Sequence, residues 1–171
     1  GENIGTEIGA RSAPDGYTLT VGSTSTLSTN VSLLPSLPFD PVRDFAPIAM
    51  LMTAPYVLIV HGSVPANSMQ ELVQFAKKNP GRLNYSSFGD GSSAHLVVEL
   101  FTSMAGVDIV HVPYKGGGPA LAAVVAGEVQ MTFGNLGVVL QQLQAGKVKG
   151  LAVSTRKRVA ALPQTPTVVE S

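Results

Sequence analysis

Hydrophobic and polar residues follow two alternating patterns from residue 56 onward. Short apolar runs predict strands, whereas apolar residues three and four positions apart predict helices between them. Strands that alternate with helices through short loops indicate a parallel sheet with helices on both faces. The predicted strands are residues 56–61, 83–88, 108–114, 129–134 and 148–153.

The ends of the predicted helices carry local signals. Ser68 and Glu71 form a capping box at the start of the first helix. Pro119 takes the first position of the third helix, and Asn135 caps the fourth. The second helix has one apolar side, formed by Leu96, Val97, Leu100, Phe101 and Met104.

The first part of the chain is less regular. We interpret residues 1–52 as an incomplete first lobe, with one strand at 17–22 followed by a polar segment and a proline-rich loop. Residues 53–155 form the predicted second α/β lobe. Residues 156–171 are predicted to return toward the first lobe.

Composition excludes several classes of protein. Hydrophobic residues make up 44% and charged residues 13%, which is typical of a globular chain. Eleven basic residues balance eleven acidic ones, and no basic run of the kind that tracks phosphates is present, so we expect no nucleic-acid partner. The chain has no cysteine, which excludes a disulfide framework and thiolate metal sites. Its longest apolar run, 45–60, contains two prolines and is shorter than the ~20 residues of a membrane span.

Glycine-rich and polar turns follow three of the predicted strands. Ligands of open α/β sheets bind at the carboxyl ends of the strands. The segments "GDGSS" (89–93), "YKGGGP" (114–119) and "GN" (134–135) should therefore lie along one edge.

The segment "GDGSSA" (89–94) matches the relaxed fingerprint of dinucleotide-binding proteins. That fingerprint also requires an acidic residue at the end of the next strand, to bind the ribose. The next strand ends in "VHVPYK" without one. A nucleotide-binding α/β enzyme is therefore the alternative interpretation. Ser92 or Ser93 could act as a nucleophile, but the spacing of residues along the chain does not identify a serine–histidine–acid set that includes either of them.

Anion binding by helix N-termini explains the same turns more simply. Ser92 can cap its own helix. Gly116 and Gly117 have no side chain that could accept hydrogen bonds from the free amides at the start of the following helix. Two such helix starts on one edge form a cradle for a carboxylate. Lys115 could add charge, and Tyr114 could lie against the ligand.

Three histidines raise the question of a metal site. His61, His95 and His111 lie on three separate elements, with no acidic companion at ligand spacing. We therefore predict neither a metal nor a cofactor. His95, in the first turn of its helix, is expected to face the cleft, and His111 to be packed in its strand.

Six stretches occur in the order that is typical of one family of transport proteins. The chain resembles the periplasmic solute-binding proteins of tripartite tricarboxylate transporters, the Bug or TctC-like family. The resemblance covers nearly the whole chain, and the stretches are "NIGTE" (3–7), "APDGYTL" (13–19), "FDPVRDFAPI" (39–48), "VPYKGGGPAL" (113–121), "AGKVKGLAV" (145–153) and "LPQTPTVVE" (162–170).

The resemblance implies two α/β lobes of the periplasmic-binding-protein kind, the first of them incomplete here. It implies a small carboxylate bound between the lobes, delivery to a membrane permease, a periplasmic location and no catalysis. The incomplete lobe is expected to favour self-association. A fragment that folds but binds nothing is a further possibility. The implied ligand-binding residues are Ser23, Thr24, Ser25, Ser92, Ser93, His95, Tyr114, Lys115, Gly116, Gly117 and Asn135.

Overall fold

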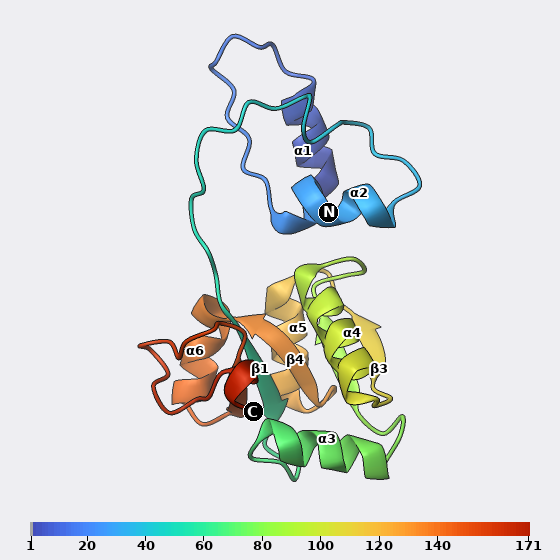
Figure 1. Ribbon diagram of the computed structural model, residues 1–171, viewed down its shortest axis with the longest axis vertical. Helices are drawn as coiled ribbons and strands as arrows, with labels where there is room; N and C mark the ends of the chain where they lie inside the picture. The colour runs from blue at the N-terminus through green and yellow to red at the C-terminus, as the bar shows by residue number, and fades with distance from the viewer. Residues whose placement is uncertain (1) are drawn as a thin grey trace. The chain divides into compact units, whose positions relative to one another are not determined.

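The computed structural model describes residues 2–171, which divide into two compact units (Figure 1). Unit 1 ends at Met52, and unit 2 comprises Thr53–Ser171. Unit 2 holds all the predicted alternating elements and is described first.

A five-stranded sheet forms the centre of unit 2, with the strand order β3-β2-β4-β1-β5. Residues 56–61 and 148–153 are strands at the predicted bounds, and the other three strands are shorter than predicted. The strands are β1 (Tyr56–His61), β2 (Asn84–Ser87), β3 (Val110–Pro113), β4 (Met131–Asn135) and β5 (Val148–Val153).

The sheet is mixed, although most of its strands point the same way. Strand β2 pairs in parallel with β3 and β4. Strand β1 lies between β4 and β5 and pairs antiparallel with both. Strand β1 is therefore the exception to the predicted parallel arrangement, because the hydrophobic pattern of a strand is the same in both directions. The α/β class and the parallel-rich sheet are confirmed.

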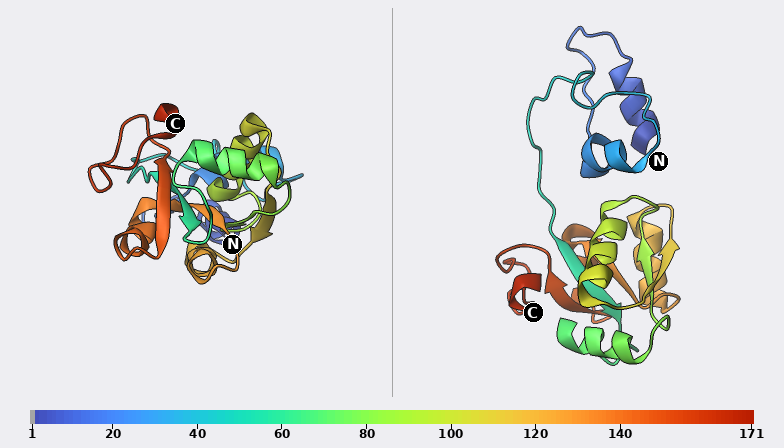
Figure 2. Two further views of the ribbon diagram at one scale, coloured as in Figure 1. Left: turned by 90° about the horizontal axis from the view of Figure 1, so that it is seen from below. Right: turned by 45° about the vertical axis from the view of Figure 1, so that its right-hand side comes forward.

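Two helices cover each face of this sheet. Helices α3 (Met69–Lys78) and α4 (Ser93–Ala105) pack over one core cluster, which includes Leu58 and Tyr85. Helices α5 (Gly117–Ala126) and α6 (Leu136–Gln144) pack over a second cluster, which includes Val57 and Ile59. The left view of Figure 2 shows the strands of unit 2 between these two pairs of helices.

Local capping signals account for the ends of α3 and α4. Ser68 accepts a hydrogen bond from the amide of Glu71 at 3.1 Å, as predicted. The Glu71 carboxylate accepts from the amide of Asn67, one residue earlier than a capping box requires. Gly106 ends α4 with φ of 62°, the left-handed conformation in which glycine has no steric penalty.

The buried face of α4 differs from the predicted one. Ala94, Val98 and Phe101 are buried, whereas Leu100 and Met104 are 61% and 80% exposed. Both sets have helical spacing, so periodicity alone cannot choose between them. The small Ala94 lets the start of the helix approach the sheet, a property that a hydrophobicity pattern does not report.

The start of α5 also differs from the prediction. The helix begins at Gly117, so Pro119 occupies its third position and not its first. Proline is tolerated there because the first-turn amides of a helix have no partner within the helix.

Unit 1 is helical where it is regular. It contains α1 (Glu2–Ala10), the π-helical turn η1 (Ser25–Thr29) and α2 (Asn30–Leu33). No strand occurs within residues 2–52, so the predicted strand at 17–22 is wrong. A strand needs a hydrogen-bonded neighbour, and the described part of unit 1 offers none.

Residues 156–171 contact the edge strand β5 of unit 2. The amide of Val153 donates to the carbonyl of Pro166 at 2.8 Å, and Val153 also forms a parallel bridge with Thr167. A short 3-10 helix, η2 (Val168–Glu170), follows. The predicted course of this segment toward the first lobe stays a prediction.

Candidate functional site

Three turns meet at one edge of the sheet in unit 2. They follow β2, β3 and β4, which are parallel and therefore end at the same edge. The turns after β2 and β3 lie close together, since a Cβ built on Gly89 would be 3.6 Å from the carbonyl oxygen of Tyr114. A Cβ on Gly117 would likewise be 3.6 Å from the ring of Phe88.

An aromatic pair at this edge was not predicted. Strand β1 is antiparallel, so it begins where the other strands end, and its Tyr56 stacks on Phe88 at 6.3 Å between ring centroids. Phe88 could have been noted as an aromatic residue directly before the glycine turn. Tyr56 could not, because its position depends on the direction of β1.

The N-terminus of α4 has two amides available to a ligand. Ser92 caps the helix as predicted, with its hydroxyl oxygen accepting from the amide of His95 at 3.3 Å. The amides of Ser93 and Ala94 have no acceptor within residues 2–171. Both residues belong to the first turn, where the helix dipole favours an anion.

The N-terminus of α5 is open as well. Gly116 is its N-cap and has no side chain to accept from the helix, as the sequence predicts. The amides of Gly117 and Gly118 have no acceptor in the described part of the chain. Lys115 is exposed, and Tyr114 is half-buried against the core beneath α5 and α6.

Asn135 does not cap α6, contrary to the prediction. Its side chain accepts nothing from the first turn of α6. The Oδ1 atom is buried and has no hydrogen-bond partner among the described residues. It is therefore an acceptor that remains available at the same edge of the sheet.

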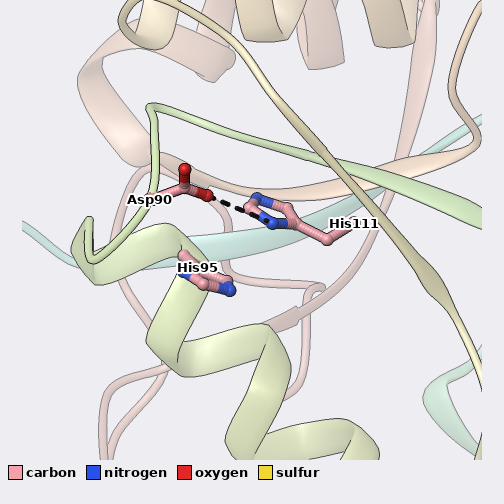
Figure 3. Close-up of side chains that lie close together, drawn as sticks. All are labelled: Asp90, His95 and His111. Carbon is pink, nitrogen blue, oxygen red and sulfur yellow. Dashed lines mark ion pairs between the residues drawn. The ribbon is translucent and has the colours of Figure 1, made fainter.

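Two histidines and an aspartate form a cluster beside the turn after β2 (Figure 3). The rings of His95 and His111 stack with centroids 4.0 Å apart and planes 9° from parallel. His111 Nδ1 lies 3.7 Å from Asp90 Oδ1, and His95 Nε2 lies 3.8 Å from Glu99 Oε1. The prediction that no acidic residue accompanies these histidines is wrong, because folding brings β3, α4 and the turn together.

Burial controls the chemistry of this cluster. Burial, and then the neighbouring charge of His95, lowers the pKa of His111. Burial and a 2.6 Å hydrogen bond to Glu99 raise the pKa of Tyr85, whose ring stacks on His111. The interior of the cluster thus favours a neutral imidazole and a neutral phenol.

The cluster is not a preformed metal centre. Asp90, His95 and His111 each offer a ligand atom within 4.8 Å of the others. A metal ion lies in the plane of each imidazole that binds it, about 2.0–2.1 Å from the nitrogen for zinc. Two nearly parallel rings 4.0 Å apart cannot both meet that condition unless one of them rotates.

The same residues include a serine–histidine–aspartate arrangement. The Ser87 hydroxyl lies 2.6 Å from His111 Nε2, and Asp90 faces the other ring nitrogen. Ser87 is fully buried, however, and its hydroxyl oxygen also bonds the backbone of Gly89. A nucleophile must reach its substrate, so this arrangement supports the turn and is not a catalytic triad.

The three site residues predicted from the first lobe lie in unit 1. Ser23 bonds locally, with its hydroxyl oxygen accepting from the amide of Thr26 at 3.3 Å. Thr24 and Ser25 begin the turn η1. Their part in ligand binding stays a prediction.

A comparison with protein families decides the identity of this fold. Residues 1–171 match the model described as "Tripartite tricarboxylate transporter family receptor". The chain belongs to this family. The predicted resemblance is confirmed.

Relatives of this receptor family show how much of a typical member the chain represents. A UPF0065 protein of Bordetella pertussis is 39% identical over 99% of this chain, which covers 52% of that protein. Protein BugT of the same organism is 36% identical over 98% of this chain, which again covers 52% of the relative. The chain therefore spans about half the length of these relatives.

Solved structures with bound acids resemble the chain closely. "R. palustris Rpa4515 with adipate" has a TM-score of 0.94 and 37% identity, over 99% of this chain and 57% of that one. "MatC (Rpa3494) from Rhodopseudomonas palustris with bound malate" has a TM-score of 0.88 and 32% identity, over 98% of this chain and 57% of that one. None of the helices among residues 2–171 of this receptor-family chain has the length and apolar character needed to cross a membrane.

Proposed function

We propose that the chain is part of a periplasmic solute-binding protein that captures a small carboxylate at the carboxyl edge of the unit 2 sheet. One observation carries the proposal. The first turns of α4 and α5 open at this edge, where the turns preceding them are in contact, and together they offer four amides without acceptors, those of Ser93, Ala94, Gly117 and Gly118. Each helix start also contributes partial positive charge, so the pair suits an anion.

The ligand-bound relatives support a carboxylate as that anion. Two of them are structures with adipate and with malate, and both of these acids carry two carboxylate groups. A carboxylate has two oxygens and several lone pairs, so it can accept from both helix starts at once.

Side chains at this edge supply selectivity in the proposal. Lys115 adds a positive charge, and Ser92 and Tyr114 border the amides. Asn135 Oδ1 accepts from a hydroxyl group of the ligand or from a water that the ligand holds. Ser23, Thr24 and Ser25 of unit 1 contact the ligand from the other lobe, and the loaded protein delivers it to the membrane permease of a tripartite tricarboxylate transporter.

Thermal unfolding with matched acids and amides tests this function. Adipate or malate should raise the melting temperature, whereas adipamide, the neutral diamide of adipate, should not. A ligand at 100 times its dissociation constant stabilises the folded state by about 2.7 kcal/mol, which is easily measured.

Three outcomes would contradict the proposal. Equal shifts with adipate and adipamide would mean that charge is not recognised. A fluorescence titration in which NADH binds and the acids do not would favour the nucleotide-binding enzyme instead. No shift with any acid would support a fragment that folds without binding.

A further inference from the structure

The turn between β2 and α4 is held by two histidines through different bonds. His95 Nδ1 accepts from the amide of Gly91 at 3.1 Å. His111 Nε2 lies 2.6 Å from the Ser87 hydroxyl, whose oxygen in turn accepts from the amide of Gly89 at 3.2 Å. One imidazole thus bonds the end of the turn directly, and the other bonds its beginning through a serine.

Two other hydrogen bonds hold the first part of the turn, because the carbonyl of Gly89 accepts from the amide of Ser92 at 3.2 Å and from the Ser87 hydroxyl at 3.1 Å. Neither of them engages the amide of Gly91. Gly89 and Gly91 have φ of 122° and 71°. Glycine adopts positive φ about as readily as negative φ, so neither residue fixes this conformation by itself. Asp90, between them, is 82% exposed. The bond from the amide of Gly91 to His95 therefore orients the end of the turn, which leads directly to the amides of Ser93 and Ala94.

We propose that His95 is a positioning residue for the carboxylate site, and that protonation of the stacked His95–His111 pair releases the turn and weakens ligand binding. This inference rests on the proposed function. It assigns no contact between His95 and the ligand, because the imidazole acts through the amide of Gly91.

The chemistry of the imidazole provides the switch. A neutral ring has one acceptor nitrogen, and in His95 the amide of Gly91 occupies it. Protonation converts that nitrogen into a donor and breaks the bond. The amide of Gly91 can then turn toward water, and the peptide just before the first turn of α4 loses the bond that orients it.

The surroundings of the pair set how many protons it can take. Asp90 faces His111 from the turn, Glu99 faces His95 from α4, and Tyr85 of β2 stacks on both rings. Glu99 lies on the side of His95, and Asp90 lies on the side of His111, whose pKa is lowered by burial. A second charge only 4.0 Å away is disfavoured, so the pair changes state with the first proton.

A direct attraction between protonated His95 and the anionic ligand would instead strengthen ligand binding on acidification. Glu99 lies within 3.8 Å of His95 Nε2 and offsets part of that attraction. We therefore expect the loss of the Gly91 bond to outweigh this attraction, so that ligand binding weakens on protonation. The experiment distinguishes the two effects.

Calorimetry with adipate between pH 8 and pH 6 tests the inference. His95→Asn places an amide oxygen at the position of Nδ1 and does not titrate in this range. Between pH 8 and pH 6, the affinity of wild type should fall about fivefold more than the affinity of His95→Asn. Titration of adipate itself cancels in this comparison at each pH.

Two further variants complete the design. His95→Leu removes the acceptor and should bind about fivefold more weakly at every pH. His61→Asn is the matched control, because His61 lies at the other end of β1 and bonds Ser63, and its profile should match that of wild type. Rescue by Asn but not by Leu separates positioning from simple space filling.

A readout without ligand keeps the inference distinct from the proposed function. In NMR spectra of the free protein, the Gly91 amide should exchange slowly at pH 8 and lose protection as the histidine rings take up protons. Failure of wild type to bind acids at pH 8 would overturn the proposed function, whereas the Gly91 amide would still report on the turn. Parallel profiles for wild type and His95→Asn, or binding that strengthens in wild type on acidification, would overturn the inference.

Discussion

The imidazole rings of His95 and His111 lie face to face, 4.0 Å apart between centroids and 9° from parallel. His95 comes from the first turn of α4 and His111 from the edge strand β3. The stack thus joins the helix that offers amides to a ligand to the sheet that supports it. It also makes the charge state of two side chains depend on one another.

Stability should fall as the pH decreases through the range in which histidine titrates. Because burial lowers the pKa of His111 below the ordinary 6.5, the unfolded chain binds a proton more readily than the folded one. The stability contributed by neutral His111 is therefore present above pH 6.5 and is lost as the pH falls through the lower, folded-state pKa. Urea midpoints at pH 7.5 and pH 5.0 measure this loss.

His111→Gln should reduce that dependence on pH. Glutamine does not titrate, and its amide can still reach the Ser87 hydroxyl. An unchanged difference between the two midpoints in this variant would assign the acid sensitivity to other groups.

Gly117→Pro should weaken acid binding with little effect on folding. Gly117 is the first residue of α5, a position that accepts proline, and the substitution removes one amide without an acceptor. A hydrogen bond to a charged group contributes about 1.5–3 kcal/mol, and we expect a loss of that size in calorimetry.

Lys115→Ala is the comparison for the same site. Lys115 is exposed, so its charge is screened and its removal should cost about 1 kcal/mol or less. A larger loss from Lys115→Ala than from Gly117→Pro would mean that side-chain charge and not backbone amides dominates recognition.

Gly116→Ala should destabilise unit 2 by about 1–3 kcal/mol, because Gly116 has φ of 108° and ψ of 174°, a region that is essentially restricted to glycine. Gly118→Ala is the control in the same helix. A Cβ there meets nothing within 4 Å, and alanine favours a helix over glycine by about 1 kcal/mol. Chemical denaturation should show a loss of stability for Gly116→Ala and a gain for Gly118→Ala. Equal changes in stability would contradict the backbone argument.

Unit 1 should promote self-association of this chain. Tyr17, Leu19 and Val21 are 91%, 73% and 78% exposed, and exposed apolar side chains at alternate positions favour pairing between chains. Light scattering should report more than one chain per particle, and Leu19→Lys should shift it toward the monomer. Hydrogen exchange should be slower in residues 56–153 than in residues 2–50. A monomer with uniform protection would contradict this prediction.

Local sequence determined the features that depend on neighbouring residues. Ser68 and Ser92 cap α3 and α4 as predicted, because each cap is a bond across three positions of the same segment. Glycine at 116 leaves the start of α5 open for the same reason. The ends of β1 and β5 were predictable because polar or turn-forming residues follow directly. These features also identified the helix starts of the candidate site.

Only the tertiary structure decided the features that depend on distant partners. The direction of β1 is set by its pairing with β4 and β5. Because β1 is antiparallel to both strands, its first residue, Tyr56, lies beside Phe88. Segment 17–22 has the pattern of a strand but no partner strand within the described unit 1. His95, His111 and Asp90 meet because two elements and a turn converge, which spacing along the chain cannot reveal. Local hydrogen bonds form from what a segment contains, whereas pairing, stacking and burial depend on what the rest of the fold places beside it.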